Sequence, residues 1–309
     1  MSAPLPAARR AHAEHARSLR AGLERRLVQS LTELLGSACT ALSREPVSLQ
    51  SALSAAASPD SKLPPWLFGL NARLQRCMRA GDGEAVARLL TLADALRPRA
   101  LPARGWQIGR AGDAGDFWHI AVEMPALEPY SRELPELQRA ADVLREGAPE
   151  LHAELDVLLA QLAVCESRGF NGACDPELFG LALLHRPRSH HHPLAYFLEQ
   201  LIHCGAQLHW ICRHTDRALL ATRDPLRIES PWNRQPVTSY ELLFELFWLD
   251  RAVPAFRAFS DLTAEPAIAQ KTAVLEHGYR SVLELAEAHL PTRLTAAGRS
   301  LLGELAQTA

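Results

Sequence analysis

Leucine spacing is the feature that most narrows what this chain can fold into. In the segment 23–42, LERRLVQSLTELLGSACTAL, leucines recur at three- and four-residue steps, at Leu23, Leu27, Leu31, Leu34 and Leu35. This period places apolar side chains along one face of a helix. The segment 84–96, EAVARLLTLADAL, repeats the pattern and stops before Pro98. We therefore expect helices through residues 7–97, interrupted by a loop at 58–65.

The middle of the chain has a different pattern of polar and apolar residues. Residues 105–124, GWQIGRAGDAGDFWHIAVEM, alternate in polarity and carry glycines, which predicts two short strands around a Gly-Asp turn. Residues 133–167 return to a helical pattern, and we expect long helices there, broken near Gly147 and Pro149. Residues 172–185, GACDPELFGLALLH, predict a turn that leads into a short apolar strand.

The last third of the chain is predicted to be helical again. We expect a helix at 194–214, an extended piece at 225–232, a helix at 239–256 interrupted by Pro254, and a last long helix at 267–290. The predicted fold class is mainly α (α+β), multi-helical with a small β element in the middle of the chain. Residues 1–100 would form an N-terminal helical region and residues 101–309 a second domain, or the two would form one continuous domain.

Composition and charge limit the partners. Hydrophobic residues make up 48% and charged residues 22%, which is typical of a soluble globular protein. The formal net charge is −2 and no segment is strongly basic, so we expect no nucleic-acid partner. No apolar run is long enough to cross a bilayer, and the N-terminus lacks the apolar core of a signal peptide. We therefore expect no membrane partner. The six cysteines are scattered and form no C-x-x-C pair, which favours reduced thiols and a cytoplasmic location.

Metal-ligand chemistry is suggested by the segment 198–210, LEQLIHCGAQLHW. Glu199, His203 and Gln207 are four residues apart and share one helix face, with Cys204 beside His203. A histidine and a carboxylate at this spacing can bind one metal ion. The same pair also occurs as a surface ion pair or a partly buried histidine with a hydrogen-bonding neighbour. The tract SHHHP at 189–193 is interpreted as a turn entering this helix.

A second candidate segment is 230–245. Prolines 231 and 236 bracket a rigid stretch that contains Arg234, and the following helix places Glu241 and Glu245 on one face. Arg234 could clamp a carboxylate, and either glutamate could supply oxygen to a metal held by His203. The alternative is a loop that packs its tryptophan beside two solvated acids. The chain contains no Gly-rich phosphate loop and no G-x-S-x-G elbow.

Three segments taken in order resemble one family. LFGLALL at 178–184, LIHCGAQ at 201–207 and SPWNRQPVTSYELL at 230–243 are similar to the ordered motifs of the HExxH-type peptide β-hydroxylases that modify ribosomally made peptides. The resemblance covers roughly the last two thirds of the chain. It implies an HExxH-hydroxylase-like domain at 101–309. Members are thought to bind Fe(II) through three histidines and to use 2-oxoglutarate and oxygen to hydroxylate a precursor peptide.

The chain departs from this family at the ligand positions. His203 matches the first ligand, whereas Cys204 stands for the motif glutamate, Gln207 for the second histidine, and Leu242 lies near the later histidine's place. Asn233 and Gln235 stand where the family has arginines. The resemblance therefore implies a degenerate iron site, and no residue is assigned a catalytic role. It also implies that the carboxylate held by Arg234 would be that of 2-oxoglutarate or of the peptide.

Three functions follow as alternatives. The first is a pseudoenzyme of ribosomal-peptide maturation, which binds a precursor peptide or supports a partner modifying enzyme and uses no cofactor. The second is an active hydroxylase that uses Fe(II) and 2-oxoglutarate at a site rebuilt from His203, Glu199 and Glu245 or Glu241. The third is a helical interaction protein unrelated to peptide modification.

Overall fold

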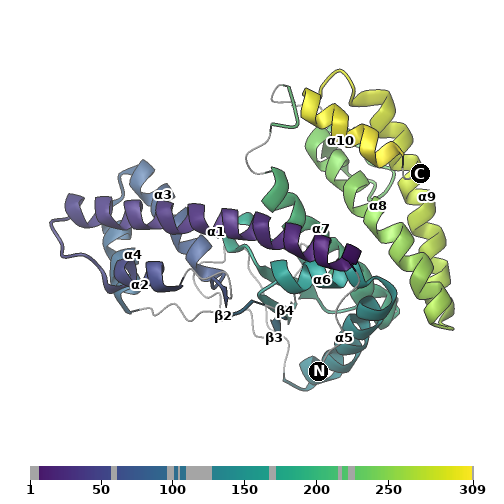
Figure 1. Ribbon diagram of the computed structural model, residues 1–309, viewed down its shortest axis with the longest axis horizontal. Coiled ribbons are helices and arrows are strands. Elements are labelled where there is room, and N and C mark those ends of the chain that lie inside the picture. The colour runs from purple at the N-terminus through teal and green to yellow at the C-terminus, as the bar shows by residue number, and fades with distance from the viewer. Residues whose placement is uncertain are drawn as a thin grey trace. The chain divides into compact units, whose positions relative to one another are not determined.

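The fold is mainly α with a small β element, as the sequence predicts (Figure 1). Ten α-helices lie in the described part of the chain, and the strands are short. The computed structural model describes residues 7–56, 61–95, 101–103, 105–108, 127–166, 172–214, 218–221 and 227–307. None of the helices within these ranges is both long enough and apolar enough to span a membrane.

The chain divides into two compact units. Unit 1 comprises residues 1–131 and 153–186, and unit 2 comprises residues 132–152 and 187–309. These bounds differ from the regions 1–100 and 101–309 expected from the sequence. Residues 153–186 belong with the N-terminal helices because the two pack together. The Phe179 ring, for example, lies 5.4 Å from that of Phe68.

Four helices of unit 1 form its N-terminal half: α1 (Ala7–Ala41), α2 (Ser48–Ala56), α3 (Trp66–Ala80) and α4 (Gly83–Ala95). Helices α2, α3 and α4 each contact α1 (Figure 1). The predicted leucine stripe provides the contact, since Leu31 and Leu35 are fully buried, as are Leu53, Leu70 and Leu90 from the other three helices. Gly81 ends α3 in a left-handed conformation (φ 69°), which glycine adopts without steric cost.

Unit 1 also contains a four-stranded sheet of order β3-β4-β6-β5. Strands β3 (Gln107–Ile108), β4 (Gln161–Cys165) and β6 (Leu181–His185) are parallel, and β5 (Gly172–Ala173) is antiparallel to β6. Strand β6 confirms the predicted apolar strand. A separate antiparallel pair joins β1 (Ser61–Lys62) to β2 (Leu101–Pro102). Of the two strands expected at 105–124, residues 107–108 form β3, and 109–124 lie outside the described residues.

The prediction of helix through residue 167 was wrong in its last part. Helix α5 (Leu127–Gly147) gives way to α6 (Pro149–Leu158), so the break near Gly147 is confirmed, but residues 161–165 form strand β4. Leu162, Ala163, Val164 and Cys165 are all buried. A short apolar run buried on both faces has no alternation, so its periodicity does not distinguish a strand from a buried helix.

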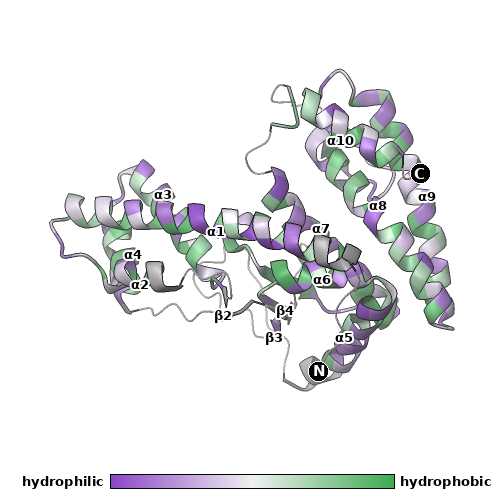
Figure 2. Ribbon diagram, viewed as in Figure 1, coloured by the Kyte–Doolittle hydropathy of each residue, from purple (hydrophilic) through white to green (hydrophobic). Residues whose placement is uncertain are grey.

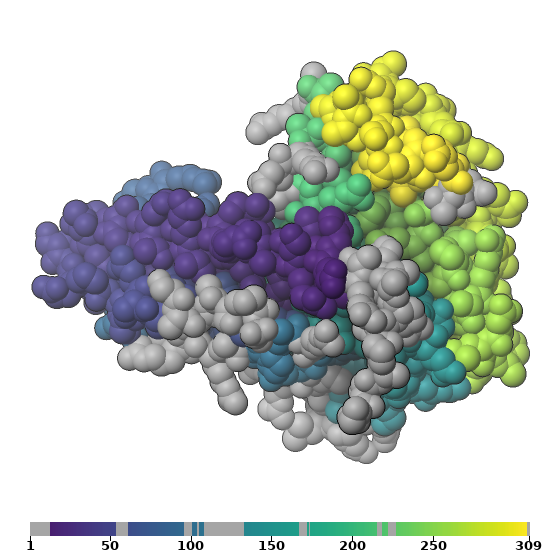
Figure 3. All heavy atoms as spheres, in the orientation of Figure 1, coloured from purple at the N-terminus to yellow at the C-terminus, as the bar shows by residue number. Residues whose placement is uncertain are grey.

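Unit 2 contains most of α5. Its other elements are α7 (Pro193–His214), α8 (Ser239–Leu262), α9 (Pro266–His289) and α10 (Ala296–Ala306), with the hairpin β7 (Arg227–Glu229) and β8 (Pro236–Thr238). Helix α8 packs along α9, and hydrophobic and hydrophilic residues alternate along α9 in Figure 2. The C-terminal helix α10, yellow in Figure 3, lies against α9. Tyr279 Oη of α9 donates a hydrogen bond to the Leu305 carbonyl of α10.

The predicted helices at 194–214 and 267–290 are confirmed as α7 and α9. The predicted interruption at Pro254 was wrong, because α8 continues through it to Leu262. Proline in a helix interior costs about 3 kcal/mol. Val253, Ala255 and Phe256 around it are all buried, and their packing offsets that cost.

Candidate functional site

His203 is held between aromatic rings of the neighbouring helix. It lies half-buried in the middle of α7, and its ring meets those of Phe244 (5.5 Å) and Trp248 (5.3 Å) of α8 edge-on. Its Nδ1 atom is buried and makes no hydrogen bond to any described residue. A buried ring nitrogen without a partner is uncommon in folded proteins and marks a position where ligand chemistry is worth testing.

Glu245 lies near His203, and both of its carboxylate oxygens are already engaged. Oε2 accepts a hydrogen bond from Ser230 Oγ and Oε1 accepts one from Asn233 Nδ2, each at 2.6 Å. Burial raises the pKa of Glu245, while these two hydrogen bonds and the nearby His203 ring oppose the rise. The carboxylate proposed from the sequence as a metal ligand therefore fastens the 230–235 loop to α8.

The 230–235 loop is rigid by its own hydrogen bonds. Ser230 Oγ accepts from the backbone N–H of Trp232 (3.1 Å), and Asn233 Oδ1 accepts from the N–H of Gln235 (2.8 Å). Arg234 adopts a left-handed conformation (φ 55°), and its side chain is exposed. The arginine predicted to clamp a carboxylate thus projects from a strained turn, where a non-glycine residue is uncommon.

Trp232 connects this loop to α9. Its ring lies 5.4 Å from that of Trp248, and Lys271 Nζ lies 5.7 Å from a Trp232 ring centroid. A Cβ atom added to Gly278 would come within 2.3 Å of Trp232 Cε3. The indole therefore rests directly on the backbone of α9, and only glycine allows that approach.

The other two predicted carboxylate ligands have separate structural roles. Glu199 forms an ion pair with Lys271 of α9 at 2.7 Å, and both side chains are largely buried. Glu241 closes the capping box of α8, since its Oε2 accepts from the Thr238 N–H at 2.6 Å and Thr238 Oγ1 accepts from the Glu241 N–H at 3.2 Å. Within the described ranges, no three His, Cys, Asp or Glu side chains come close enough together to hold a metal ion.

The three ligand positions that depart from the family motif lie on α7 and α8, and none of them is exposed. Cys204 and Leu242 are fully buried and Gln207 is half-buried. A non-haem iron site of the expected type needs three protein ligands on one face. His203 is the one imidazole among the predicted ligands. Each predicted carboxylate is already bonded to a group other than a metal. The residues present therefore do not fit such a centre.

A cavity of about 260 Å³ lies between the start of α7 and the start of α9. The His191 ring stacks on Tyr196 with centroids 4.9 Å apart, and the Glu199–Lys271 pair forms part of the wall. The lining residues are His190, His191, His192, Ala195, Tyr196, Glu199, Ala267, Gln270, Lys271 and Val274. The SHHHP tract, expected to be a turn entering α7, thus borders a cavity. Helical periodicity could place Tyr196 near Glu199, but nothing in the sequence pointed to Lys271.

No protein-family model matches this chain, and no curated protein shows significant similarity to it.

Proposed function

We propose that this chain binds a precursor peptide during the maturation of a ribosomally made peptide, and that it does so without an iron centre of its own. The observation that carries the proposal is the commitment of Glu199, Glu241 and Glu245 to structural contacts. These carboxylates stabilise the fold around His203 instead of converging on it. The resemblance to peptide β-hydroxylases supplies the peptide as substrate class, and the departures from its motif favour binding over oxidation.

The cavity between α7 and α9 is suited to a peptide side chain. Its volume of about 260 Å³ is that of a side-chain pocket and is below the usual range for a drug-sized ligand. The Tyr196–His191 stack offers a flat aromatic surface. Lys271, beside its ion pair with Glu199, and three histidines offer hydrogen-bond donors. We therefore propose that a side chain of the peptide that accepts hydrogen bonds enters this cavity.

The test is a binding measurement with any short peptide encoded beside this chain's gene. Fluorescence anisotropy of the labelled peptide should show saturable binding to the wild-type protein. We expect Lys271→Ala to weaken it about tenfold, since one charge-assisted hydrogen bond contributes about 1.5–3 kcal/mol. Arg257→Ala is the matched control, because it removes an exposed ion pair between α8 and α9 outside the cavity. Equal weakening by both variants, or no binding at all, contradicts the proposal.

A second function has one observation in its favour. His203 Nδ1 is buried without a partner and lies near a carboxyl whose pKa is raised. Such a pair is found at reactive sites more often than elsewhere. If the chain is instead an oxygenase rebuilt around His203, mass spectrometry should detect the gain of one oxygen atom in the peptide. His203→Ala should abolish that gain, whereas it should leave peptide affinity unchanged under the first proposal.

A further inference from the structure

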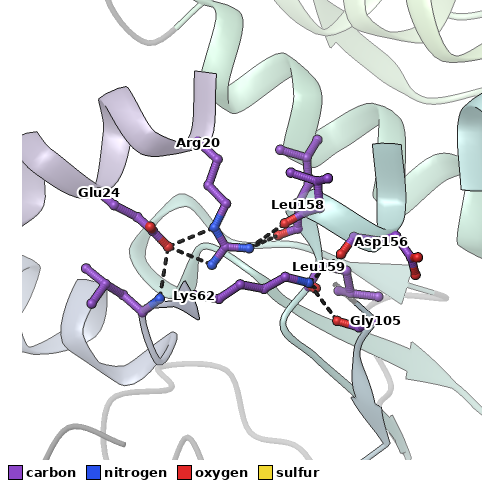
Figure 4. Close-up of polar contacts among 9 residues, drawn as sticks. Arg20, Glu24, Lys62, Gly105, Asp156, Leu158 and Leu159 are labelled. Carbon is purple, nitrogen blue, oxygen red and sulfur yellow. Dashed lines mark hydrogen bonds and ion pairs between the residues drawn. The ribbon is translucent and has the colours of Figure 1, made fainter. Parts of the chain in front are cut away.

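A buried charged cluster in unit 1 contains none of the residues predicted to bind a metal or a peptide (Figure 4). Arg20 on α1 donates two hydrogen bonds to Glu24 Oε1, at 2.8 and 2.6 Å, and a third to the Val157 carbonyl at the end of α6. The same carboxylate oxygen accepts the backbone N–H of Leu63 at 3.0 Å. Arg20 and Glu24 neutralise each other and join α1 to the start of the β element.

Lys62 completes this cluster from β1. Its side chain is almost wholly buried, and its Nζ donates to the carbonyls of Gly105, Asp156 and Leu159 (Figure 4). Burial, helped by the positive charge of Arg20, lowers the pKa of Lys62 to about 7. Three carbonyl partners match the three protons of a lysine ammonium, so this side chain is fixed in place.

Arg20, Glu24 and Lys62 of this cluster line a cavity of about 450 Å³. Its volume is within the range of sites that bind small molecules. The lining contains three arginines and one lysine but a single glutamate, together with small polar and apolar residues: Arg17, Ser18, Arg20, Ala21, Glu24, Arg25, Ser61, Lys62, Ala103 and Val157.

Two of these arginines are available to a ligand. Arg17 and Arg25 have no hydrogen bond or ion pair with any described residue, unlike Arg20 and Lys62. They lie eight residues apart on α1, a little over two turns, and therefore border the cavity from one helix face. Since Glu24 offsets Arg20, the cavity keeps an excess of positive charge at Arg17 and Arg25.

We propose that this cavity binds a small organic anion that carries a phosphate or a carboxylate group, held by Arg17 and Arg25. The guanidinium fork matches both oxyanions in geometry, and Ser18 adds a hydroxyl donor. Ala21, Ala103 and Val157 provide an apolar wall for the organic part of the ligand. This site lies within unit 1 and does not depend on peptide binding by unit 2.

Isothermal titration calorimetry at low ionic strength tests the proposal with two probes, inorganic phosphate and citrate. At least one of them should bind one-to-one, and its affinity should fall as salt is added. The double variant Arg17→Gln/Arg25→Gln should weaken binding at least tenfold. The matched control Arg26→Gln/Arg79→Gln removes the same charge from exposed positions of α1 and α3 that do not line the cavity, and should change the affinity less than twofold.

The two probes separate the sources of the oxyanion. Binding of phosphate alone would assign a phosphorylated ligand, and binding of citrate alone would assign a carboxylate. If neither probe binds the wild-type protein, or if the control double variant weakens binding as much as the cavity variant, the proposal is wrong. Circular dichroism verifies that each variant is folded before titration.

Discussion

Glu245 illustrates how the hydrogen-bond partners of a buried carboxylate depend on tertiary structure. Helical spacing places it on the same face of α8 as Glu241, and in the structure it lies near His203 of α7. Its partners, Ser230 and Asn233, lie on a loop more than ten residues away in sequence. Local spacing therefore predicts that Glu245 shares a helix face with Glu241. The hydrogen bonds from the loop to both carboxylate oxygens of Glu245 depend on tertiary structure and could not be predicted in this way.

The raised pKa of Glu245 predicts a pH-dependent effect of Glu245→Gln. A carboxyl whose pKa is higher in the folded than in the unfolded protein stabilises the fold below the unfolded pKa, and loses that contribution as pH rises through the folded pKa. Glutamine keeps the shape and cannot ionise. The free energy of unfolding of the variant, relative to wild type, should therefore increase as pH rises from about 4 to about 7.

Urea unfolding at several pH values measures this difference. Glu284→Gln is the control, because it removes an equal charge from an exposed position on α9. A Glu245→Gln difference that is flat or falls with rising pH would mean that burial does not dominate the titration of this carboxyl.

At the scale of elements, the sequence was informative wherever a helix keeps one apolar face. Helices α7 and α9 begin and end within about a residue of their predicted bounds. In α9 the buried positions follow the helical period, whereas in α7, which is buried on most sides, the less buried positions 199, 203, 207 and 211 do so. Strand β4 was missed because it is buried on both faces. Strands β1 and β2 contain two residues each, which is too short for an alternation of polar and apolar residues to be recognised.

The contact between α9 and the 230–235 loop gives an element-scale prediction. Gly278→Ala places a Cβ where the Trp232 ring now lies, so the indole must move. We expect a loss of about 1–3 kcal/mol in the free energy of unfolding, the usual cost of overpacking. Tryptophan fluorescence of the native state should change as well, since Trp232 would leave Trp248.

Gly303→Ala in α10 is the matched control for this change. A Cβ at Gly303 meets nothing within 4 Å, and alanine is the better helix former. This variant should be as stable as wild type or slightly more stable. If Gly278→Ala is equally well tolerated, Trp232 does not rest on α9 as described.

At the scale of the whole molecule, chain order and compact units do not coincide. Residues 132–152 belong to unit 2, yet they precede residues 153–186, which belong to unit 1. A boundary near residue 100, placed where the residue pattern changes, does not account for this alternation of segments between the two units. The same holds for the candidate sites, since Lys271 and the Lys62 cluster depend on contacts between distant segments.

We propose above all that unit 2 holds no iron centre around His203, and an anaerobic titration tests this proposal most directly. Purified protein is titrated with Fe(II) in the presence of 2-oxoglutarate, and the visible absorption is followed for a metal-to-ligand charge-transfer band. The commitment of Glu199, Glu241 and Glu245 to other partners predicts that no band develops. A saturable band at one iron per chain that disappears in His203→Ala would contradict this account.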